Sequence, residues 1–415
     1  MTFSVQRRDD AVGIYLSVPF CKAKCSFCNF ASGVFPESRI EGYIQRLCAE
    51  LRGARAAVDR LGGRLPERVD TIYFGGGTPS LLQANHFAQV FRVLHEEFSV
   101  DADAEVTLEA APGQMDHVAL EAAMRLGVNR VSFGVQSFVD AESAAVGRLH
   151  TGAKCREEIA RMERMGVERL SLDLIAGLPH QTGDSWDFSV REAVETGVGH
   201  VSVYLLEVDE DSRLGREAIE GGVKYGAGAL PSEDVAAEWY LAACEKLGAA
   251  GLAQYEISNF ARVGQASRHN LKYWHRQPYL GVGLDAHSML VCDGDGGDVA
   301  VRWANTDDMD GYMASGVPAR GVQGLTVLGA GSPEVDRIGV DEAFEESFFL
   351  GLRLNEGVDL GWLRNEFGGV RMDQALGSLR DVEEAGLVER RDSRVRLTAS
   401  GRLASNEVFS RLLVA

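Results

Sequence analysis

Three cysteines lie close together near the start of the chain, in the run CKAKCSFCNF. Cys21, Cys25 and Cys28 follow the apolar stretch VGIYLSVPF, and no fourth cysteine stands nearby. Thiolates are soft ligands that select zinc, copper(I) or iron–sulfur clusters. A closed structural zinc site needs four protein ligands, whereas three cysteines can hold a 4Fe–4S cluster and leave one iron open. The spacing therefore predicts a cluster whose open iron can chelate a small molecule with an amino and a carboxylate group.

Two other uses of these cysteines stay open from the spacing alone. A distant His or Asp could complete a zinc site. Disulfide pairing is the weaker alternative, because the run MTFSVQRRDDAVGIYLSV has charges where the apolar core of a secretory signal would lie. The odd total of seven cysteines fits a reducing cytoplasm. We interpret Cys48, Cys155, Cys244 and Cys292 as small buried side chains.

The composition limits the remaining function classes. Of 415 residues, 45% are hydrophobic and 25% are charged, which is typical of a globular chain with one large domain and a smaller one. The 61 acidic residues outnumber the 42 basic ones and give a net charge of −19, which argues against a nucleic-acid partner. No apolar run approaches the roughly 18 residues of a membrane span. Peripheral membrane contact stays open, and the cytoplasm is the expected location.

Short strand-like runs alternate with amphipathic helical segments along the first half of the chain. Six such runs occur, at residues 12–18, 69–75, 105–110, 129–135, 169–175 and 200–206. This alternation predicts parallel βα units with right-handed crossovers. Because six units are too few for a closed eight-unit barrel, the sequence predicts an α/β fold with an open, TIM-like (βα)6 partial barrel.

Polar and glycine-rich segments lie where these strands end. The cysteine run follows the first strand, and the run GGGTP follows the second. The next three strands end near Glu109, Gln136 and Asp173. Because parallel barrels carry their chemistry at the carboxyl ends of the strands, we expect these residues to meet at one mouth of the barrel.

Each of these residues has a chemical use and a plainer alternative. GGGTP lets the backbone approach a ligand closely, although a tight turn would need the same residues. Glu109 and Asp173 could bind ribose hydroxyls or an amino group, or they could cap a neighbouring helix. Gln136 can donate and accept hydrogen bonds at once. Arg148 could bind a carboxylate in a forked contact, although a solvated helix position would suit it equally.

Six runs between residues 15 and 274 carry a family resemblance: YLSVPFCKAKCSFCNF, YFGGGTPS, VTLEAAPG, VSFGVQSF, LDLIAGLPHQT and YEISNFARVGQASRHNLKYW. They resemble the radical S-adenosylmethionine superfamily, in its coproporphyrinogen III dehydrogenase-like branch and, within that branch, the HemW family of heme chaperones. The resemblance implies a 4Fe–4S cluster, S-adenosylmethionine and heme as ligands. It implies S-adenosylmethionine contacts at Tyr15, Phe27, Gly76, Gly77, Thr78, Glu109, Gln136, Arg148 and Asp173.

Two features are more similar to the heme chaperones than to the dehydrogenases. The dehydrogenase pattern has a fourth cysteine two residues after the third, where this chain has Phe30. The run HNLKYW is similar to the HNxxYW motif of the chaperones. It provides His269 as a candidate heme ligand, with Tyr273 and Trp274 as rings that could pack on a porphyrin. In the plainer alternative, His269 only hydrogen-bonds at the barrel mouth and Trp274 is part of the core.

One position departs from the family pattern. Members commonly have a histidine four residues before the first cluster cysteine, and this chain has Ser17 there. Because a serine hydroxyl is not a heme ligand, His269 stays the favoured candidate. His287, in the run GVGLDAHS, is the second candidate.

The character of the sequence changes after about residue 290. Residues 1–290 are predicted to form the barrel with the HNLKYW extension. Residues 291–335 are rich in Gly and Asp and are expected to connect two units. Residues 336–415 contain helical patterns, a hairpin with an RDS turn and a last helix, which predict a HemN-like, winged-helix-like domain. The acidity of the chain favours substrate cover or partner docking over DNA binding for this domain.

The resemblance implies a protein that binds heme and transfers it to acceptor proteins such as respiratory enzymes. The alternative is oxygen-independent oxidative decarboxylation of coproporphyrinogen III, in which a 5′-deoxyadenosyl radical takes hydrogen from a propionate side chain. The missing fourth cysteine argues against this enzyme. A regulatory binding module acting through the C-terminal unit is a third hypothesis. No catalytic side chain is assigned from the sequence.

Overall fold

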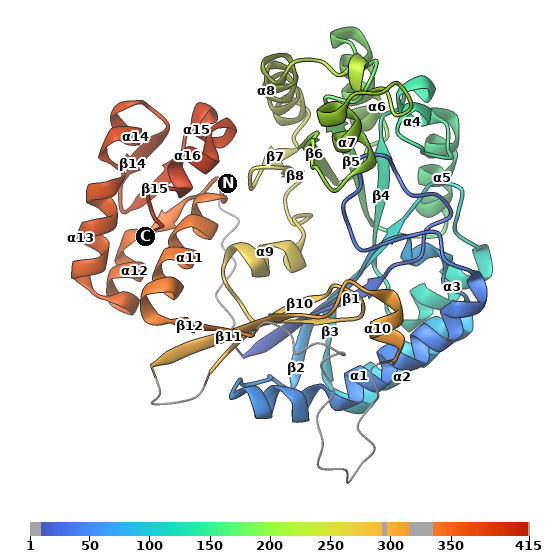
Figure 1. Cartoon of the computed structure of the whole chain (residues 1–415), viewed down its shortest axis with the longest axis horizontal. Helices are drawn as coiled ribbons and strands as arrows, with labels where there is room; N and C mark the ends of the chain where they lie inside the picture. Colours follow the sequence, from blue (N-terminus) through green and yellow to red (C-terminus); the bar gives the residue numbers. More distant parts are fainter. Residues whose placement is uncertain (1–9, 293–296, 315–334, 414–415) are drawn as a thin grey trace.

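A curved sheet with helices on its outer side forms the largest part of the molecule. The structure is a computed structural model that describes residues 10–292, 297–314 and 335–413. A smaller, mainly helical unit lies at one edge of the sheet (Figure 1). Within these described ranges, none of the helices combines the length and the apolar character that a membrane crossing requires.

Six parallel strands form the centre of the sheet and follow one another in chain order. They are β1 (Ala11–Val18), β2 (Arg68–Gly76), β3 (Ser99–Ala110), β4 (Arg130–Gln136), β5 (Arg169–Ala176) and β6 (His200–Leu205). The register places Ile14 opposite Ile72 and Val131 opposite Leu170. The α/β partial barrel predicted from the sequence is therefore confirmed.

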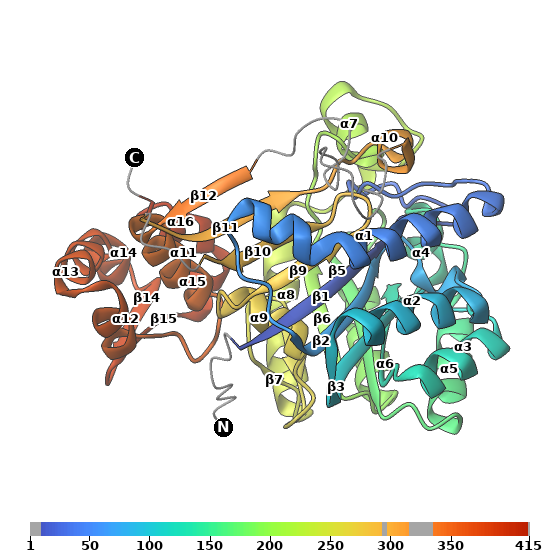
Figure 2. The same cartoon turned by 90° about the horizontal axis from the view of Figure 1, so that it is seen from below.

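Helices connect these strands on the outer face of the sheet. They are α1 (Ile40–Leu61), α2 (Ala84–Glu97), α3 (His117–Leu126), α4 (Asp140–Ala145), α5 (Gly152–Arg164) and α6 (Gly183–Glu195), with short 3-10 turns η1 (Glu37–Arg39) and η2 (Pro79–Leu81). Local caps set several boundaries: the Asp116 side chain accepts from Ala119 N at the start of α3, and Gly62 ends α1 with a φ of 76°. Figure 2 shows α1 and α2 lying along the outside of β1 to β3.

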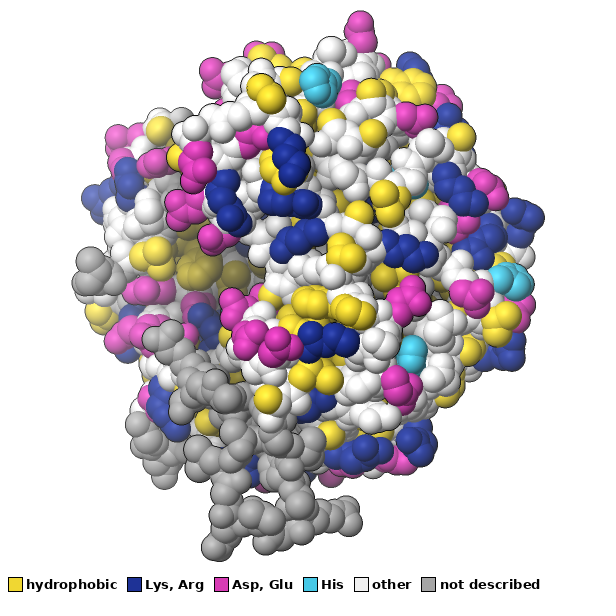
Figure 3. Space-filling view, turned by 45° about the vertical axis from the view of Figure 1, so that its right-hand side comes forward, with side chains coloured by type: hydrophobic (Ala, Val, Ile, Leu, Met, Phe, Trp, Pro, Cys, Tyr) yellow, Lys and Arg dark blue, Asp and Glu magenta, His cyan; other side chains and the backbone are white. Residues whose placement is uncertain are grey.

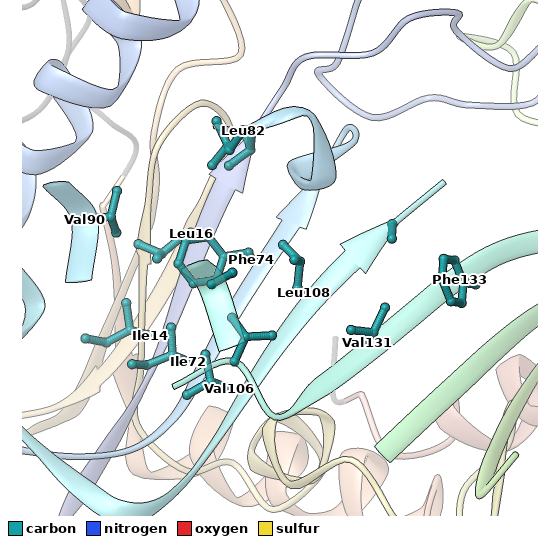
Figure 4. Close-up of a cluster of buried hydrophobic side chains, with 14 of the residues drawn as sticks. Ile14, Leu16, Ile72, Phe74, Leu82, Val90, Val106, Leu108, Val131 and Phe133 are labelled. Atoms are coloured by element: carbon teal, nitrogen blue, oxygen red, sulfur yellow. The ribbon is translucent and has the colours of Figure 1, made fainter. Parts of the chain in front are cut away.

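Alternation along the strands gives the sheet an apolar outer face and a polar inner face. Ile14 and Leu16 of β1 pack with Ile72 and Phe74 of β2 in the core beneath the helices (Figure 4). Because successive side chains of a strand point to opposite faces, the residues between them point into the barrel. These inner residues include Tyr15, Thr71, Tyr73, Glu105, Thr107, Glu109, Arg130, Ser132, Ser171 and Asp173.

The sheet continues beyond the six central strands. Its order is β12-β11-β10-β9-β1-β2-β3-β4-β5-β6-β8-β7. The added strands are β7 (Ala253–Gln254), β8 (Asn259–Ala261), β9 (Tyr279–Val282), β10 (His287–Val291), β11 (Asp298–Ala304) and β12 (Val335–Gly339). The prediction that residues 291–335 only connect two units is therefore wrong for their described part, because β11 is part of this sheet and α10 (Met309–Ala314) packs on α1. Residues 293–296 and 315–334 lie outside the described residues.

Helix α9 (Arg268–Trp274) lies on the open side of the barrel and not on its outer surface (Figure 1). It follows a segment that contains α7 (Arg213–Glu220), η3 (Ala227–Ala229) and α8 (Glu233–Ala249). The Ser267 side chain accepts from Asn270 N and starts the helix. α9 therefore presents the HNLKYW run to the inner face of the sheet.

The C-terminal unit packs around an apolar core that also includes Met289 of β10, Ala300 of β11 and Ile338 of β12. Its elements are α11 (Val340–Leu352), β13 (Val358–Asp359), α12 (Leu360–Phe367), α13 (Gly369–Ser378), α14 (Arg380–Glu384), β14 (Val388–Arg391), β15 (Arg394–Leu397), α15 (Ala399–Leu403) and α16 (Ser405–Phe409). The helices and the hairpin predicted for this region are present. Glu346 of α11 accepts from Arg276 Nε at 2.7 Å and also from Arg302, which attaches the unit to the end of α9 and to β11.

Candidate functional site

The loop between β1 and η1 carries the three clustered cysteines. Cys25 is buried, Cys21 and Cys28 are half-buried, and all seven cysteines of the chain are free thiols. Cys21 N donates to Gly33 O at 2.9 Å, and Gly33 N donates to Pro19 O at 2.9 Å. These bonds close the loop on itself beside the end of β1. Disulfide pairing of these cysteines, which the spacing left open, is not present.

Each of the three sulfurs has a polar neighbour. Thr78 Oγ1 donates to Cys21 Sγ at 3.7 Å, and Arg148 Nη1 donates to Cys25 Sγ at 3.4 Å. Cys28 Sγ lies 3.8 Å from Ser32 Oγ. Burial raises the pKa of the Cys21 thiol, and the hydrogen bond from Thr78 opposes this rise. A bound metal and these donors would favour the thiolate forms.

Zinc and a 4Fe–4S cluster make different demands on the three sulfurs. In the described part of the chain, no group of three or more His, Cys, Asp or Glu side chains converges as the ligands of one ion would. A tetrahedral zinc site requires such convergence. A 4Fe–4S cluster binds each thiolate through a different iron, so its sulfurs need not share a centre. The described residues hold no preformed zinc site, and the choice between zinc and a cluster does not rest on this arrangement.

The glycine-rich loop after β2 lies directly against the cysteine loop. Gly77 N donates to Val18 O at 2.9 Å, and Thr78 N donates to Phe20 O at 2.8 Å. A Cβ on Gly77 would lie 2.8 Å from the carbonyl carbon of Pro19, and Gly76 has a φ of 105°. Packing against the cysteine loop therefore already requires glycine at position 77, before any ligand contact is considered.

Two half-buried carboxylates point to the inner face of the sheet: Glu109 near the end of β3 and Asp173 within the second half of β5. Burial raises the pKa of Glu109 to about 7, although Tyr73 donates a hydrogen bond to its Oε1 at 2.9 Å. Burial also raises the pKa of Asp173 to about 6, and hydrogen bonding by Ser202 opposes the rise. Both carboxylates line an internal cavity of about 50 Å³. The pair suits a ligand that brings hydroxyl, amino or cationic groups.

Gln136 and Arg148 converge at the end of β4. Gln136 has a φ of 67°, which is a strained conformation for a residue with a side chain. Its Oε1 is buried and has no hydrogen-bond partner in the structure. Arg148 Nη2 donates to Gly134 O, and a Cβ on Gly134 would lie 3.0 Å from both Arg148 Nη2 and Gln136 Nε2. A buried acceptor without a donor fits a site that a ligand completes.

Tyr15 lies on β1, and Phe27 lies within the cysteine loop. The Tyr15 ring stacks on Tyr73 with centroids 5.9 Å apart, on the inner face of the sheet. Phe27 packs against a small cluster that contains Val146 and Leu178. The structure therefore places the predicted S-adenosylmethionine contacts around the barrel mouth, with Phe27 on its cysteine-loop side. Their contact with S-adenosylmethionine stays a prediction.

Both ring nitrogens of His269 have hydrogen-bond partners inside the protein. Its Nδ1 lies 2.9 Å from Thr71 Oγ1, and its Nε2 lies 2.9 Å from the hydroxyl of Tyr273. The side chain is 1% exposed, and burial lowers its pKa to about 3. In this structure neither ring nitrogen is open to a heme iron. The hydrogen-bonding alternative stated for His269 describes the geometry better than the heme-ligand expectation.

The rings of Tyr273 and Trp274 do not share one ligand surface. Tyr273 lines a cavity at the barrel mouth. Trp274 lines a different cavity toward the C-terminal unit, and the Arg353 guanidinium lies 4.3 Å from the centre of its ring. The expected set of His269, Tyr273 and Trp274 around one porphyrin is therefore not brought together, because successive residues of α9 face different neighbours.

A cavity of about 300 Å³, here called the mouth cavity, lies between the cysteine loop and β9. Its lining includes Tyr15, Phe30, Ser32, Tyr273, Tyr279 and His287. The Tyr273 and Tyr279 rings are 4.7 Å apart, edge to face, and the His287 side chain is 62% exposed. Sequence reasoning missed Tyr279, although it stands in the same PYLGVGLDAHS run as His287.

Ser17, which stands where relatives commonly have histidine, also lines the mouth cavity. A Cβ on Gly76 would lie 3.1 Å from Ser17 Oγ, so the serine lies directly against the glycine loop.

On the surface in Figure 3, Lys and Arg side chains are mixed with Asp and Glu side chains. Phe30 of the cysteine loop is 63% exposed, which is unusual for a large apolar side chain.

The sequence matches two family models and several known proteins along most of its length. The radical SAM superfamily model matches residues 15–193, and the HemN C-terminal domain model matches residues 340–404. The chain is 31% identical over 404 residues to the heme chaperone HemW of Bacillus subtilis, covering 96% of this chain and 98% of that protein. It is 33% identical over 408 residues to the heme chaperone HemW of Mycobacterium tuberculosis, covering 97% and 94%.

Two further relatives extend the comparison. The mitochondrial radical S-adenosyl methionine domain-containing protein 1 of Mus musculus is 34% identical over 372 residues, which cover 89% of this chain and 79% of that protein. The solved structure of coproporphyrinogen III oxidase (HemN) from Escherichia coli has a TM-score of 0.79, covers 97% of this chain and 90% of that chain, and is 22% identical. At that identity the likeness shows the fold alone. The chain belongs to the radical S-adenosylmethionine superfamily and, within it, to the family of the HemW proteins.

Membership of this superfamily implies a 4Fe–4S cluster and S-adenosylmethionine, and the residues present fit both groups. The three thiols lie in one loop, and two of them accept hydrogen bonds from Thr78 and Arg148. Gln136 Oε1, at the end of β4, is buried without a hydrogen-bond partner, and the half-buried carboxylates Glu109 and Asp173 line one small cavity. Their chemistry suits the amino and ribose groups of S-adenosylmethionine.

Proposed function

We propose that this protein is a cytoplasmic heme chaperone that binds heme, a 4Fe–4S cluster and S-adenosylmethionine and transfers heme to acceptor proteins such as respiratory enzymes. The observation that carries the proposal is similarity over nearly the whole chain to proteins named heme chaperone, at 31% identity over 404 residues in one case. Phe30 in place of a fourth cysteine supports the same choice, as the family resemblance implies.

Cys21, Cys25 and Cys28 would hold the cluster, which supplies an electron-storing centre with one open coordination position. The loop from Gly76 to Thr78 would place backbone groups against S-adenosylmethionine, beside the cysteines. Glu109 and Asp173 would accept hydrogen bonds from its amino or ribose groups in the barrel. Tyr15, Phe27, Gln136 and Arg148 complete the proposed S-adenosylmethionine site.

The mouth cavity is the proposed heme site. Tyr273 and Tyr279 offer flat rings that could pack on a macrocycle, and the exposed imidazole of His287 could ligate the iron. A volume of about 300 Å³ lies at the lower end of the range of about 300–1,000 Å³ that is typical of ligand pockets. We assign His287 as the favoured ligand, since both nitrogens of His269 are hydrogen-bonded inside the protein.

A heme titration of the purified full-length protein tests this assignment. The His287→Ala variant should change the heme absorption spectrum and weaken the affinity at least tenfold, which corresponds to about 1.4 kcal/mol. His117→Ala is the matched control, because His117 is also exposed, at 60%, and lies on α3 away from the cavity. An unchanged spectrum and affinity in His287→Ala would refute the ligand assignment. Failure of the wild-type protein to take up heme would refute the proposed function itself.

The dehydrogenase alternative is tested separately. Anaerobic protein with a reconstituted cluster would be incubated with coproporphyrinogen III, S-adenosylmethionine and a reductant. We expect no vinyl-group formation above the level of the Cys25→Ala variant, which lacks one cluster ligand. Rapid conversion of propionate to vinyl groups by the wild-type protein would replace the chaperone proposal with the enzyme.

A further inference from the structure

The guanidinium of Arg148 lies between a cluster cysteine and the end of β4. Nη1 donates to Cys25 Sγ at 3.4 Å, and Nη2 donates to the carbonyl of Gly134. The neighbours of the other two cysteine sulfurs are the neutral hydroxyls of Thr78 and Ser32. Within the described residues, Cys25 therefore differs from Cys21 and Cys28 in having a charged donor on its sulfur.

The position of Cys25 is fixed from two sides. Ser26 N donates to Val146 O at 3.1 Å, and Leu214 N donates to Ser26 O at 2.8 Å. Gly147 has a φ of 81°, and a Cβ there would lie 3.9 Å from Cys25 Cα. The cysteine and the segment that carries Arg148 are thus in direct backbone contact. This packing holds the backbone before Arg148 next to Cys25, so the guanidinium can reach the Cys25 sulfur.

Among the described residues, Arg148 forms no ion pair with a carboxylate. In the part of the chain that the structure describes, Arg148 donates to Cys25 Sγ and Gly134 O, and its buried Nε has no hydrogen-bond partner. Asp173 is near enough for the Arg148 charge to lower its pKa, without forming an ion pair with it. Cys25 is only 9% exposed, so water screens the charge weakly.

Hydrogen bonds and charges at the sulfur ligands set the reduction potential of iron–sulfur clusters. A reduced cluster carries more negative charge than an oxidised one, so a cationic donor at a ligand sulfur stabilises the reduced state more. We propose that Arg148 is a positioning residue that raises the reduction potential of the cluster through its contact with Cys25. This role is distinct from the S-adenosylmethionine contact predicted for Arg148 from the family, and it rests on the cluster of the proposed function.

The test is a redox titration, followed by electron paramagnetic resonance, of the full-length protein with a reconstituted cluster and without S-adenosylmethionine. Arg148→Gln should shift the potential to a more negative value while iron and sulfide contents stay at the wild-type level. Arg148→Lys, which keeps the charge but loses the forked donor, should give a smaller negative shift. Arg213→Gln is the matched control, because Arg213 donates to the backbone carbonyl of Lys24 in the same loop and contacts no sulfur.

Each outcome decides the inference. An unchanged potential in fully loaded Arg148→Gln, or an equal shift in Arg213→Gln, would overturn it. If Arg148→Gln does not assemble the cluster, the lysine variant decides, since a potential at or above the wild-type value would contradict the proposal. A wild-type protein that takes up no iron or sulfide would instead refute the cluster, and with it the proposed function.

Discussion

The hydroxyl of Tyr273 lies 2.9 Å from Nε2 of His269, and the ring of the same tyrosine lines the mouth cavity. The other nitrogen of His269 lies 2.9 Å from Thr71 Oγ1 on β2. The histidine of the HNLKYW run thus joins a cavity wall to the inner face of the sheet. Its structural role follows from these two bonds, and it leads to the first prediction.

His269→Ala should destabilise the protein without changing its heme spectrum. The substitution leaves Thr71 Oγ1 and the Tyr273 hydroxyl without their partner, and each lost buried hydrogen bond costs about 0.5–1.5 kcal/mol. We expect the free energy of unfolding in urea to fall by about 1–3 kcal/mol. His117→Ala is the control for both measurements. An unchanged free energy of unfolding together with a new heme spectrum would mean that His269 is a heme ligand after all.

Lys272→Met should be among the more destabilising substitutions in α9. Lys272 Nζ lies 2.8 Å from Asp70 Oδ1, with the two side chains only 2% and 8% exposed. Removal of one partner of a buried ion pair leaves an uncompensated charge and costs about 3–5 kcal/mol. Arg268→Gln, whose pair with Asp103 is exposed, should cost about 0–1 kcal/mol. The double variant Lys272→Met/Asp70→Asn should regain part of the free energy of unfolding, measured in urea. A Lys272→Met variant as stable as Arg268→Gln would contradict the prediction.

Gly77→Ala should disturb the cysteine loop before any ligand binds. The added Cβ would lie 2.8 Å from the carbonyl carbon of Pro19, which is backbone and cannot rotate away. Overpacking of this kind costs about 1–3 kcal/mol, and we expect a lower iron content after reconstitution. Gly248→Ala in α8 is the control, because its Cβ would meet nothing within 4 Å. Equal stability and equal iron content in the two variants would show that the glycine loop and the cysteine loop pack less tightly than described.

The stability that Glu109 contributes should decrease as the pH rises. Burial raises the folded-state pKa of this carboxyl from 4.5 to about 7, so the folded state binds the proton more tightly than the unfolded state. The contribution is complete below a pH of about 4.5 and is lost as the pH rises through about 7. The free energy of unfolding of the wild type relative to Glu109→Gln should therefore fall across this window. The same series with Glu121→Gln, at an exposed position on α3, is the control; a constant difference between wild type and Glu109→Gln would contradict the raised pKa.

The spacing of residues predicted the central sheet and the place of the site. The six strand-like runs became β1 to β6, because alternating and continuous apolar runs between helices specify parallel βα units. Glu109 and Gln136 lie at the strand ends where the barrel rule placed them, whereas Asp173 lies three residues before the end of β5. The three-cysteine spacing also predicted the family correctly.

The roles within α9 could not be predicted from the sequence. A helix of seven residues is too short for its periodicity to show which side each residue faces. The partners of His269 and Trp274, namely Thr71 and Arg353, stand far away in the sequence. Strand β11 was missed for a local reason, since the Gly- and Asp-rich run before it suggested that the whole segment was a connection.

The alternation of the central strands assigns packing and hydrogen bonding to different, neighbouring residues of each strand. Ile72 and Phe74 hold the sheet to the helices, whereas Thr71 and Tyr73, their neighbours in the chain, belong to the hydrogen-bonded lumen. Exchanges among polar residues on the lumen side leave the packing between sheet and helices untouched. Natural variants of this fold can therefore acquire a different ligand preference at alternate positions of a strand while the packing between sheet and helices persists.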